Sequence, residues 1–292
     1  MPPVGAELTS IRSPRVKAAR QLAKRSLRQQ ARQFLAEGPQ AVGEALAAGG
    51  VVTQLFVTAA AQARYASLVG LAAGQGADVH AVSGEVMTEL AQTITPQGVL
   101  AVCRFVDVPL DQLSAGPGGR PPGLALAVVL ASVRDPGNAG TVLRTADAAG
   151  AGGVVFAGSS VDPYNSKCVR ASAGSLFHLP VVTGPPVADA VRSLRERGLR
   201  VLAADGGAGT TLDDLQSAGR LSQPTAWLFG NEAWGLPSDV LHLADDAVAV
   251  PIYGRAESLN LAAAAAVCLY ASARAQAPPA RAGRAAANLT EL

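Results

Sequence analysis

The sequence predicts an α/β fold, in which a C-terminal parallel sheet carries helices on both faces and follows a smaller N-terminal α/β domain. Three observations lead to this prediction: apolar runs of strand length, helical patterns between them, and a Gly/Pro-rich segment in the middle of the chain. The apolar runs lack polar alternation, which is typical of strands that are covered on both faces. They lie at 124–131, 154–156, 199–204, 225–230 and 247–252.

The length of 292 residues, with 49% hydrophobic and 16% charged residues, is enough for two cores. The segment 111–123 is rich in Gly and Pro and has no periodicity, as an interdomain linker should be. We therefore expect an N-terminal domain at 1–110 and a C-terminal domain at 124–276. The Ala-, Pro- and Arg-rich end, 277–292, is expected to be a disordered tail.

Helices are expected where apolar residues recur at helical spacing. In the first domain one helix should start at the capping pair Ser13 and Pro14 and continue to Phe34. Further helices are expected at 39–48, 59–73 and 84–90, with strands at 51–58, 79–82 and 99–106. In the second domain they are expected at 139–149, 165–173, 187–197 and 258–273.

The composition argues against several classes of protein. Three cysteines without CxxC or Cys/His spacing disfavour a disulfide framework and a zinc site, so we expect no metal and a reducing cytoplasm. No uncharged apolar stretch reaches the roughly 18 residues of a membrane span, and no signal peptide is evident, so we expect a soluble protein without membrane contact. Phosphate-loop, HExxH and GxSxG motifs are missing, which disfavours NTPases and hydrolases.

Positive charge is concentrated near the N-terminus. Between residues 8 and 36 there are eight basic residues and no acid, whereas the remainder of the chain has a net charge of −6. On one continuous helix, most of these side chains would share a stripe that is spaced to meet backbone phosphates, although a solvated surface helix would give the same pattern. The candidate RNA-binding residues are Arg12, Arg15, Lys17, Arg20, Lys24, Arg28 and Arg32.

Three segments place Gly, Asn and a charged residue where an apolar run ends: 135–150, 228–237 and 251–264. Loops that leave buried parallel strands expose polar groups to a ligand at one edge of the sheet. Each segment has a purely structural alternative: Asn138 or Ser258 as a helix cap, and Glu232 as the acid before a helix. From any one segment alone, the structural and functional interpretations are equally open.

In combination, the three segments resemble the SpoU (TrmH-like) family of the SPOUT RNA 2′-O-ribose methyltransferases. The matching motifs, in the family's order, are NAGTVLR at 138–144, GNEAWGL at 230–236 and PIYGRAESLNLA at 251–262. Residues 10–38 are similar to the opening of the RNA-binding module of ribosomal-protein L30-like fold that larger members carry. TPQGVLAV at 95–102 resembles its close.

The resemblance implies a homodimeric catalytic domain with a deep trefoil knot that holds S-adenosyl-L-methionine. It places Gly230, Ile252, Leu259 and Leu261 around that cofactor. The catalytic set implied in the same way is Arg144, Asn138, Glu232, Ser258 and Asn260. One departure is Ala262, where some members have Ser or Thr.

Some family mechanisms make Arg144 the base that removes the ribose proton. Because the pKa of arginine is roughly 12.5 to 13.8, we hypothesise instead that Arg144 grips a phosphate and stabilises the developing alkoxide. By analogy the RNA is 23S ribosomal RNA, in a housekeeping or an antibiotic-resistance role such as that of thiostrepton-resistance enzymes. The alternatives are a transfer RNA substrate, methylation of a base, and a non-catalytic RNA-binding or ribosome assembly factor.

Overall fold

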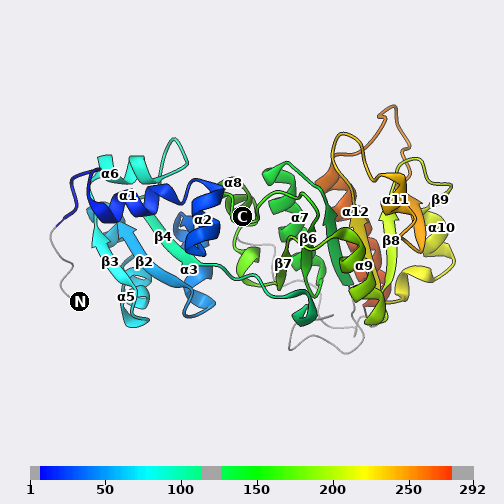
Figure 1. Ribbon diagram of the computed structural model, residues 1–292, viewed down its shortest axis with the longest axis horizontal. Helices are drawn as coiled ribbons and strands as arrows, with labels where there is room; N and C mark the ends of the chain where they lie inside the picture. The colour runs from blue at the N-terminus through cyan, green and yellow to red at the C-terminus, as the bar shows by residue number, and fades with distance from the viewer. Residues whose placement is uncertain (1–6, 114–125, 278–292) are drawn as a thin grey trace.

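The protein contains two sheets, each with its own helices. A computed structural model describes residues 7–113 and 126–277. Figure 1 shows the smaller, N-terminal sheet on the left and the larger, C-terminal sheet on the right. The predicted α/β fold class is confirmed, since the larger sheet has seven strands that all pair in parallel.

The N-terminal sheet has the order β1-β4-β2-β3, in which only β2 and β3 pair in parallel. Helices cover both of its faces, α3 and α5 on one and α1 and α6 on the other. The strands are β1 (Gln33–Glu37), β2 (Val52–Val57), β3 (Asp78–Ala81) and β4 (Val99–Arg104). The helices are α1 (Pro14–Gln21), α2 (Arg25–Ala31), α3 (Pro39–Ala47), α4 (Ala59–Arg64), α5 (Ala66–Gly74) and α6 (Gly84–Leu90).

The C-terminal sheet has the order β7-β6-β5-β10-β8-β11-β9. The five predicted apolar runs form five of its strands, three of which are buried at every residue, while β8 and β11 are partly buried at one or both ends. The strands are β5 (Leu126–Ala131), β6 (Val154–Ala157), β7 (Val181–Thr183), β8 (Arg200–Ala204), β9 (Thr210–Thr211), β10 (Thr225–Phe229) and β11 (Asp246–Ala249). The helices are α7 (Pro136–Ala149), α8 (Ser166–Ala171), α9 (Val187–Glu196), α10 (Leu212–Ser217), α11 (Ser238–Leu241) and α12 (Leu261–Gln276).

Alternate residues of β5 belong to different cores. Val128 and Leu130 pack with α7 and α12 on one face, whereas Ala127 and Val129 pack with α9 on the other. Because α7 and α12 also pack against each other, the helix that follows β5 is fixed beside the last helix of the described chain. This pairing brings the first and third motif segments to one end of the sheet.

The predicted long basic helix is wrong. The chain forms α1 and α2 with a break at residues 22–24, and then β1, in which Phe34 is fully buried. Ser13 precedes α1 but makes no capping hydrogen bond through its side chain. The spacing of the apolar residues corresponds to a helix only within α1 and within α2, not across both. The predicted helix at 59–73 is also interrupted, at Tyr65 between α4 and α5.

The two halves of the protein share a buried junction. The guanidinium of Arg28 donates from Nε (2.9 Å) and Nη2 (2.7 Å) to Asp162 Oδ2, and both residues are 3% exposed. Its Nη1 donates to the carbonyl oxygens of Leu22 and Ala23. Nearby, the rings of Phe34 and Tyr164 lie 4.7 Å apart across the same junction. The N-terminal and C-terminal sheets are therefore joined through a packed contact.

In the part of the chain that the structure describes, no helix is long and apolar enough to cross a membrane. Within residues 7–113 and 126–277, no three His, Cys, Asp or Glu side chains gather as metal ligands would. Most of the predicted linker, 111–123, and all but residue 277 of the predicted tail lie outside the described residues. Those two predictions stay predictions.

Candidate active site

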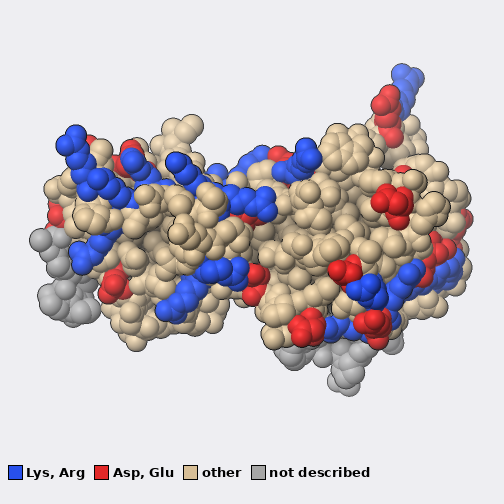
Figure 2. All heavy atoms as spheres, in the orientation of Figure 1, with Lys and Arg blue, Asp and Glu red and all other residues tan. Residues whose placement is uncertain are grey.

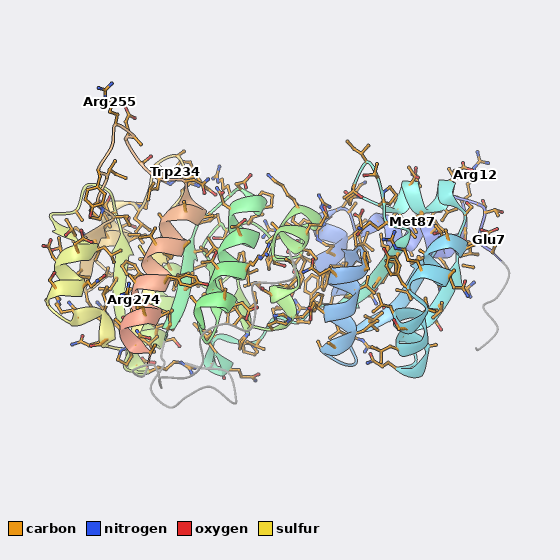
Figure 3. The ribbon with its side chains drawn as sticks, turned by 180° about the vertical axis from the view of Figure 1, so that it is seen from behind. Glu7, Arg12, Met87, Trp234, Arg255 and Arg274 are labelled. Carbon is orange, nitrogen blue, oxygen red and sulfur yellow. The ribbon has the colours of Figure 1, made fainter. Side chains whose placement is uncertain are left out.

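The three motif segments meet at the end of the sheet where α7 and α12 begin. They follow β5, β10 and β11, and the carboxyl ends of parallel strands lie at one edge of their sheet. Figure 3 shows Trp234, of the second segment, near the beginning of α12, whereas Arg274 marks its other end. The geometry of this edge is built by hydrogen bonds between the segments.

Asn138 links all three segments through its side chain. Its Nδ2 donates to Glu232 Oε1 at 3.3 Å, and its Oδ1 accepts a hydrogen bond from Asn260 Nδ2 at 3.1 Å. A carboxamide is suited to this position because it offers a donor and an acceptor at once. Asn138 thus contacts two other predicted site residues directly, Glu232 and Asn260, although Asn260 lies 122 residues further along the chain.

Asn138 is free for these contacts because another residue caps α7. The N-cap is Asp135, whose Oδ1 accepts from the Asn138 backbone N–H at 2.8 Å, and Pro136 occupies the first turn. The expectation that Asn138 itself is the cap is therefore wrong. Hydrogen bonds from Lys167 Nζ, at 2.9 Å, and from the Asn138 backbone hold the pKa of Asp135 below its usual value. The cap therefore stays ionised, and stabilises the helix, at neutral pH.

Glu232 is arranged as an anchor for the first loop. Its Oε2 accepts from the Arg134 backbone N–H at 3.2 Å, and its Oε1 accepts from the Asp135 backbone N–H at 3.1 Å and from Asn138. A carboxylate that accepts several N–H groups is held in one orientation. The second loop is thereby fixed against the first.

The second loop is a tight turn closed by paired backbone hydrogen bonds. Asn231 and Gly235 exchange N–H···O bonds of 2.9 Å, and Asn231 Nδ2 donates to the Ser132 carbonyl at 2.9 Å. Gly230 lies directly beneath this turn. A Cβ atom there would lie 2.4 Å from the Gly235 carbonyl carbon, closer than any side chain tolerates. Only glycine lets the turn close over the end of β10.

The third segment places Asn260, not Ser258, at the helix start. Asn260 Oδ1 accepts from the Ala262 N–H at 2.9 Å, and α12 begins at Leu261 rather than at 258 as predicted. Ser258 is exposed, and among the described residues its hydroxyl has no hydrogen-bond partner. Its hydroxyl is therefore available to a ligand.

A cavity of about 330 Å³ lies between the second and third segments. All four predicted cofactor-binding residues, Gly230, Ile252, Leu259 and Leu261, line it. Of the predicted catalytic residues, Glu232 and Ser258 line it, whereas Asn138, Asn260 and Arg144 do not. Its wall thus combines backbone, apolar side chains and a few polar groups, as small-molecule sites do.

Several residues of this cavity were not among the site residues predicted from the sequence. Asp205 and Gly206, which follow β8, and Glu257 also line it. The segment 205–209 is rich in glycine but lacks the GxGxxG spacing of a dinucleotide-binding motif, so its sequence alone does not mark it as a site. Its position after a buried strand was the usable signal, because β8 lies between β10 and β11 in the sheet and must end at the same edge.

Arg144 lies further along α7. Six residues separate it from Asn138, about 9 Å along the helix axis at 1.5 Å per residue. Its side chain is exposed, and among the described residues it has no hydrogen bond or ion pair. Arg144 therefore adjoins the network without contributing to the walls of its own chain's cavity.

The basic residues of the N-terminal part are not equivalent. Arg28, predicted to bind RNA, is buried in the junction with Asp162, so that prediction is wrong. Arg20 pairs with Glu89 and Arg32 with Asp107, which partly neutralises both. In the described chain the other four predicted residues are exposed and form no ion pair. They are Arg12, Arg15, Lys17 and Lys24, in the region where Figure 2 shows a band of positive charge along the upper left.

Comparison with known proteins identifies the family. Residues 125–270 match the SpoU rRNA Methylase family, and residues 13–101 match the MRM3-like substrate binding domain. The chain is also 31% identical, over 90% of its length and 98% of the relative's, to the 23S rRNA (guanosine(2553)-2′-O)-methyltransferase RlmP of Bacillus subtilis. The chain belongs to the SpoU rRNA methylase family. The family resemblance and the methyltransferase class predicted from the sequence are thereby confirmed.

Solved structures of this family share the whole architecture. An AdoMet-bound rRNA methyltransferase from Sinorhizobium meliloti superposes with a TM-score of 0.80 at 32% identity, covering 92% of this chain and 97% of that one. The SpoU methyltransferase AviRb of Streptomyces viridochromogenes, in complex with AdoMet, gives 0.76 at 29% identity, covering 90% and 98%. Both sheets of this methylase are therefore arranged as in enzymes that bind AdoMet.

Proposed function

We propose that this methylase transfers a methyl group from S-adenosyl-L-methionine to a ribose 2′-hydroxyl of 23S ribosomal RNA. The observation that carries the proposal is the Asn138 network, because it joins three distant motif segments beside a cavity of ligand size. Such a substrate would place the enzyme in the cytoplasm, where ribosomes are assembled.

The cavity fits the cofactor. Its volume of about 330 Å³ lies within the range of small-molecule sites, roughly 300 to 1,000 Å³. Gly230 lets the turn of residues 231–235 close at the cavity wall, and Ile252, Leu259 and Leu261 offer apolar cover for an adenine ring. When bound, S-adenosyl-L-methionine supplies a methyl group on a positively charged sulfur. The carboxylates of Asp205, Glu232 and Glu257 give the cavity wall a complementary charge.

In the reaction the ribose oxygen forms a bond to the methyl carbon, the carbon–sulfur bond breaks and leaves its electron pair on sulfur, and the 2′-hydroxyl proton passes to water. The protein must align the hydroxyl and stabilise the charge that develops on its oxygen. Arg144 is the cation for this task, since its guanidinium has no other partner in the described chain. Asn138 and Asn260 position the loops, Ser258 offers a hydroxyl to the ribose, and Glu232 fixes the loop before α7.

Ribosomal RNA is favoured over transfer RNA because named relatives act on 23S rRNA and the N-terminal part matches a substrate-binding domain. Four exposed and unpaired cations, Arg12, Arg15, Lys17 and Lys24, would contact phosphates, which position an RNA without reading its sequence. An assembly factor without catalysis would not need the cavity and its polar rim.

We further propose that the methylase is a homodimer through α7 and α12. Both helices leave residues exposed on their outer sides: Thr141, Arg144 and Ala148 on α7, and Ala263, Val267 and Tyr270 on α12. Val267 and Tyr270 are 42% and 53% exposed, and apolar surface of this kind is typical of interfaces. In such a dimer Arg144 would lie at the interface.

The dimer is tested with Val267→Arg, which places a charge in the proposed interface. Light scattering should give a dimer for the unaltered protein and a monomer for the variant, with Leu71→Arg, on the exposed side of α5, as the matched control. A variant that remains dimeric would contradict this interface.

Methylation mapping tests the proposed reaction. Ribosomal RNA from cells that lack the gene should be missing one ribose 2′-O-methyl group, and the purified enzyme with S-adenosyl-L-methionine should restore it in vitro. Methylation found on a base, or only on transfer RNA, would contradict the proposed substrate. Failure to bind the cofactor in calorimetry would favour the non-catalytic alternative.

A further inference from the structure

An indole projects from the rim of the candidate site without contributing to the cofactor cavity. Ala233 and Gly235 line that cavity, whereas Trp234, between them, does not and is 53% exposed. Figure 3 shows it at the end of the domain where α12 begins. The other tryptophan of the chain, Trp227, is fully buried and donates its indole N–H to Ser272 Oγ at 2.9 Å. Only one of the two indoles serves the core.

The backbone holds Trp234 in a fixed place. The paired bonds between Asn231 and Gly235 close the turn that carries it, and Asn231 Oδ1 accepts from the Ala233 N–H at 2.9 Å. No residue larger than glycine fits at position 230, beneath the turn. Burying an apolar ring of this size would stabilise the fold by about 2 to 3 kcal/mol. An exposed ring on a rigid turn does not contribute that stability, so stability alone does not explain its position.

A cation accompanies this ring. The guanidinium carbon of Arg134 lies 5.0 Å from the centre of the Trp234 ring, and the Arg134 backbone N–H donates to Glu232 Oε2. The indole therefore comes from the second segment, and the guanidinium comes from the residue just before the first segment. Together they present two flat, stackable groups with a positive charge directly beside the cavity.

We propose that Trp234 and Arg134 form a stacking platform for an unpaired nucleobase of the RNA substrate, next to the nucleotide whose ribose is methylated. Unstacked bases bind proteins by stacking on aromatic rings and on arginine, and the adjacent phosphate complements the guanidinium. The inference rests on the proposed function, because only an RNA whose ribose enters the site brings its neighbouring base to this rim.

Tryptophan fluorescence tests the platform directly on the full-length protein. Short single-stranded oligoadenylate should quench the Trp234 emission, and oligouridylate should quench it less because its bases stack more weakly. In the Trp234→Phe variant the remaining emission comes from Trp227, so it should not respond to either RNA. Equal responses of the unaltered and Trp234→Phe proteins would overturn the proposal.

Kinetics give an independent test. Trp234→Ala should raise the KM for ribosomal RNA roughly 5- to 100-fold, the loss expected for one stacked base. Trp234→Phe should restore most of the affinity, because it keeps an aromatic face. The affinity for S-adenosyl-L-methionine should not change in either variant. The matched control is Leu71→Ala, which removes another exposed apolar side chain, from α5, and should leave the KM unchanged.

Two other outcomes would overturn the inference. If Trp234 only holds the turn, Trp234→Ala will lose cofactor affinity and Trp234→Phe will not rescue RNA binding. If a second copy of the chain covers the ring, acrylamide will not reach it before RNA is added. Failure of the proposed function is a separate result: an enzyme that methylates no ribosomal RNA refutes that function, while quenching by oligoadenylate still decides the stacking.

Discussion

Two arginines that were both predicted from the sequence to contact RNA phosphates have opposite surroundings in the structure. In the junction between the two sheets, Arg28 is 3% exposed and donates to Asp162 and to two carbonyl oxygens. At the candidate site, Arg144 is exposed and has no partner in the described part of the chain. The guanidinium in the junction is fully used by the fold, whereas the guanidinium at the site is left for a ligand.

The molecule thus keeps the residues that stabilise its fold apart from those that serve its function. The junction buries the hydrogen-bonded pair of Arg28 and Asp162 beside packed aromatic rings, so it fixes the N-terminal sheet relative to the catalytic sheet. The site is held instead by exposed hydrogen bonds around Asn138, which cost little to rearrange when a cofactor and an RNA enter. Variants of the two regions should therefore fail in different assays.

The largest effect is expected at the junction. Arg28→Ala leaves the Asp162 carboxylate buried without its cation, so the free energy of unfolding should fall by about 3 to 5 kcal/mol. Denaturant unfolding measures this loss. Replacing both partners, as in Arg28→Met with Asp162→Leu, should cost less, because no unpaired charge remains. An Arg28→Ala protein of full stability with weakened RNA binding would reverse the comparison.

A smaller effect is expected at the network. Asn138→Ala removes two hydrogen bonds between segments, worth together about 1 to 3 kcal/mol. Cofactor affinity should fall at least about fivefold, while the loss of stability should be smaller than in Arg28→Ala. Calorimetry with S-adenosyl-L-methionine gives the affinity. Thr145→Ala, further along the same helix, is the control. Unchanged affinity would mean that the loops hold their positions without Asn138.

The sequence could predict the catalytic sheet because its strands are apolar on both faces, a pattern that little else produces. It could not predict β1, since Phe34 and the residues before it also fit a helical spacing. Tertiary contacts favour the strand over a helix here, because β1 pairs with β4, which is distant in sequence, and Phe34 packs against Tyr164. Short elements such as β9 and α11 carry too few residues for any periodic signal.

The site was predictable as a set of motifs but not as a geometry. Asn138, Glu232 and Asn260 were named from the sequence, yet their mutual hydrogen bonds depend on strand order. Asp205 and Gly206 were missed for the same reason. They follow β8, and only the folded sheet places β8 between β10 and β11. Burial also separates Arg28 from Lys24, which sequence spacing could not do.

A modest effect is expected on the basic surface. Lys24 is exposed and unpaired within the described residues, so Lys24→Ala should weaken RNA binding and reduce the salt dependence by about one phosphate contact, a slope change of roughly 0.7 to 0.9. Binding isotherms at several salt concentrations measure the slope. Arg192→Ala, on α9 and already paired with Asp189, should leave it unchanged. Identical salt-dependence slopes for Lys24→Ala and Arg192→Ala would contradict a contact between Lys24 and the RNA.

The smallest effect concerns pH at the junction. Partial burial would lower the pKa of His178, but hydrogen bonds to Asp147 and to Glu44 of α3, and the charges of both, outweigh it and raise the pKa. A raised pKa adds stability at a pH below the unfolded value, about 6.5. That stability is lost as the pH rises through the folded value. The Tm difference between the unaltered protein and His178→Gln should therefore shrink from about pH 6 to 8; a constant difference would contradict this assignment.

The proposed division of roles is that one edge of the sheet holds the cofactor while Arg144 serves the transfer step. Calorimetry and single-turnover methylation of ribosomal RNA, run side by side on Gly230→Ala and Arg144→Ala, test it most directly. Gly230→Ala should lose cofactor binding, because its Cβ would strike the turn above it. Arg144→Ala should bind the cofactor normally and lose about 100- to 1,000-fold in rate. Ordinary turnover in Arg144→Ala, or normal cofactor affinity in Gly230→Ala, would contradict the claim.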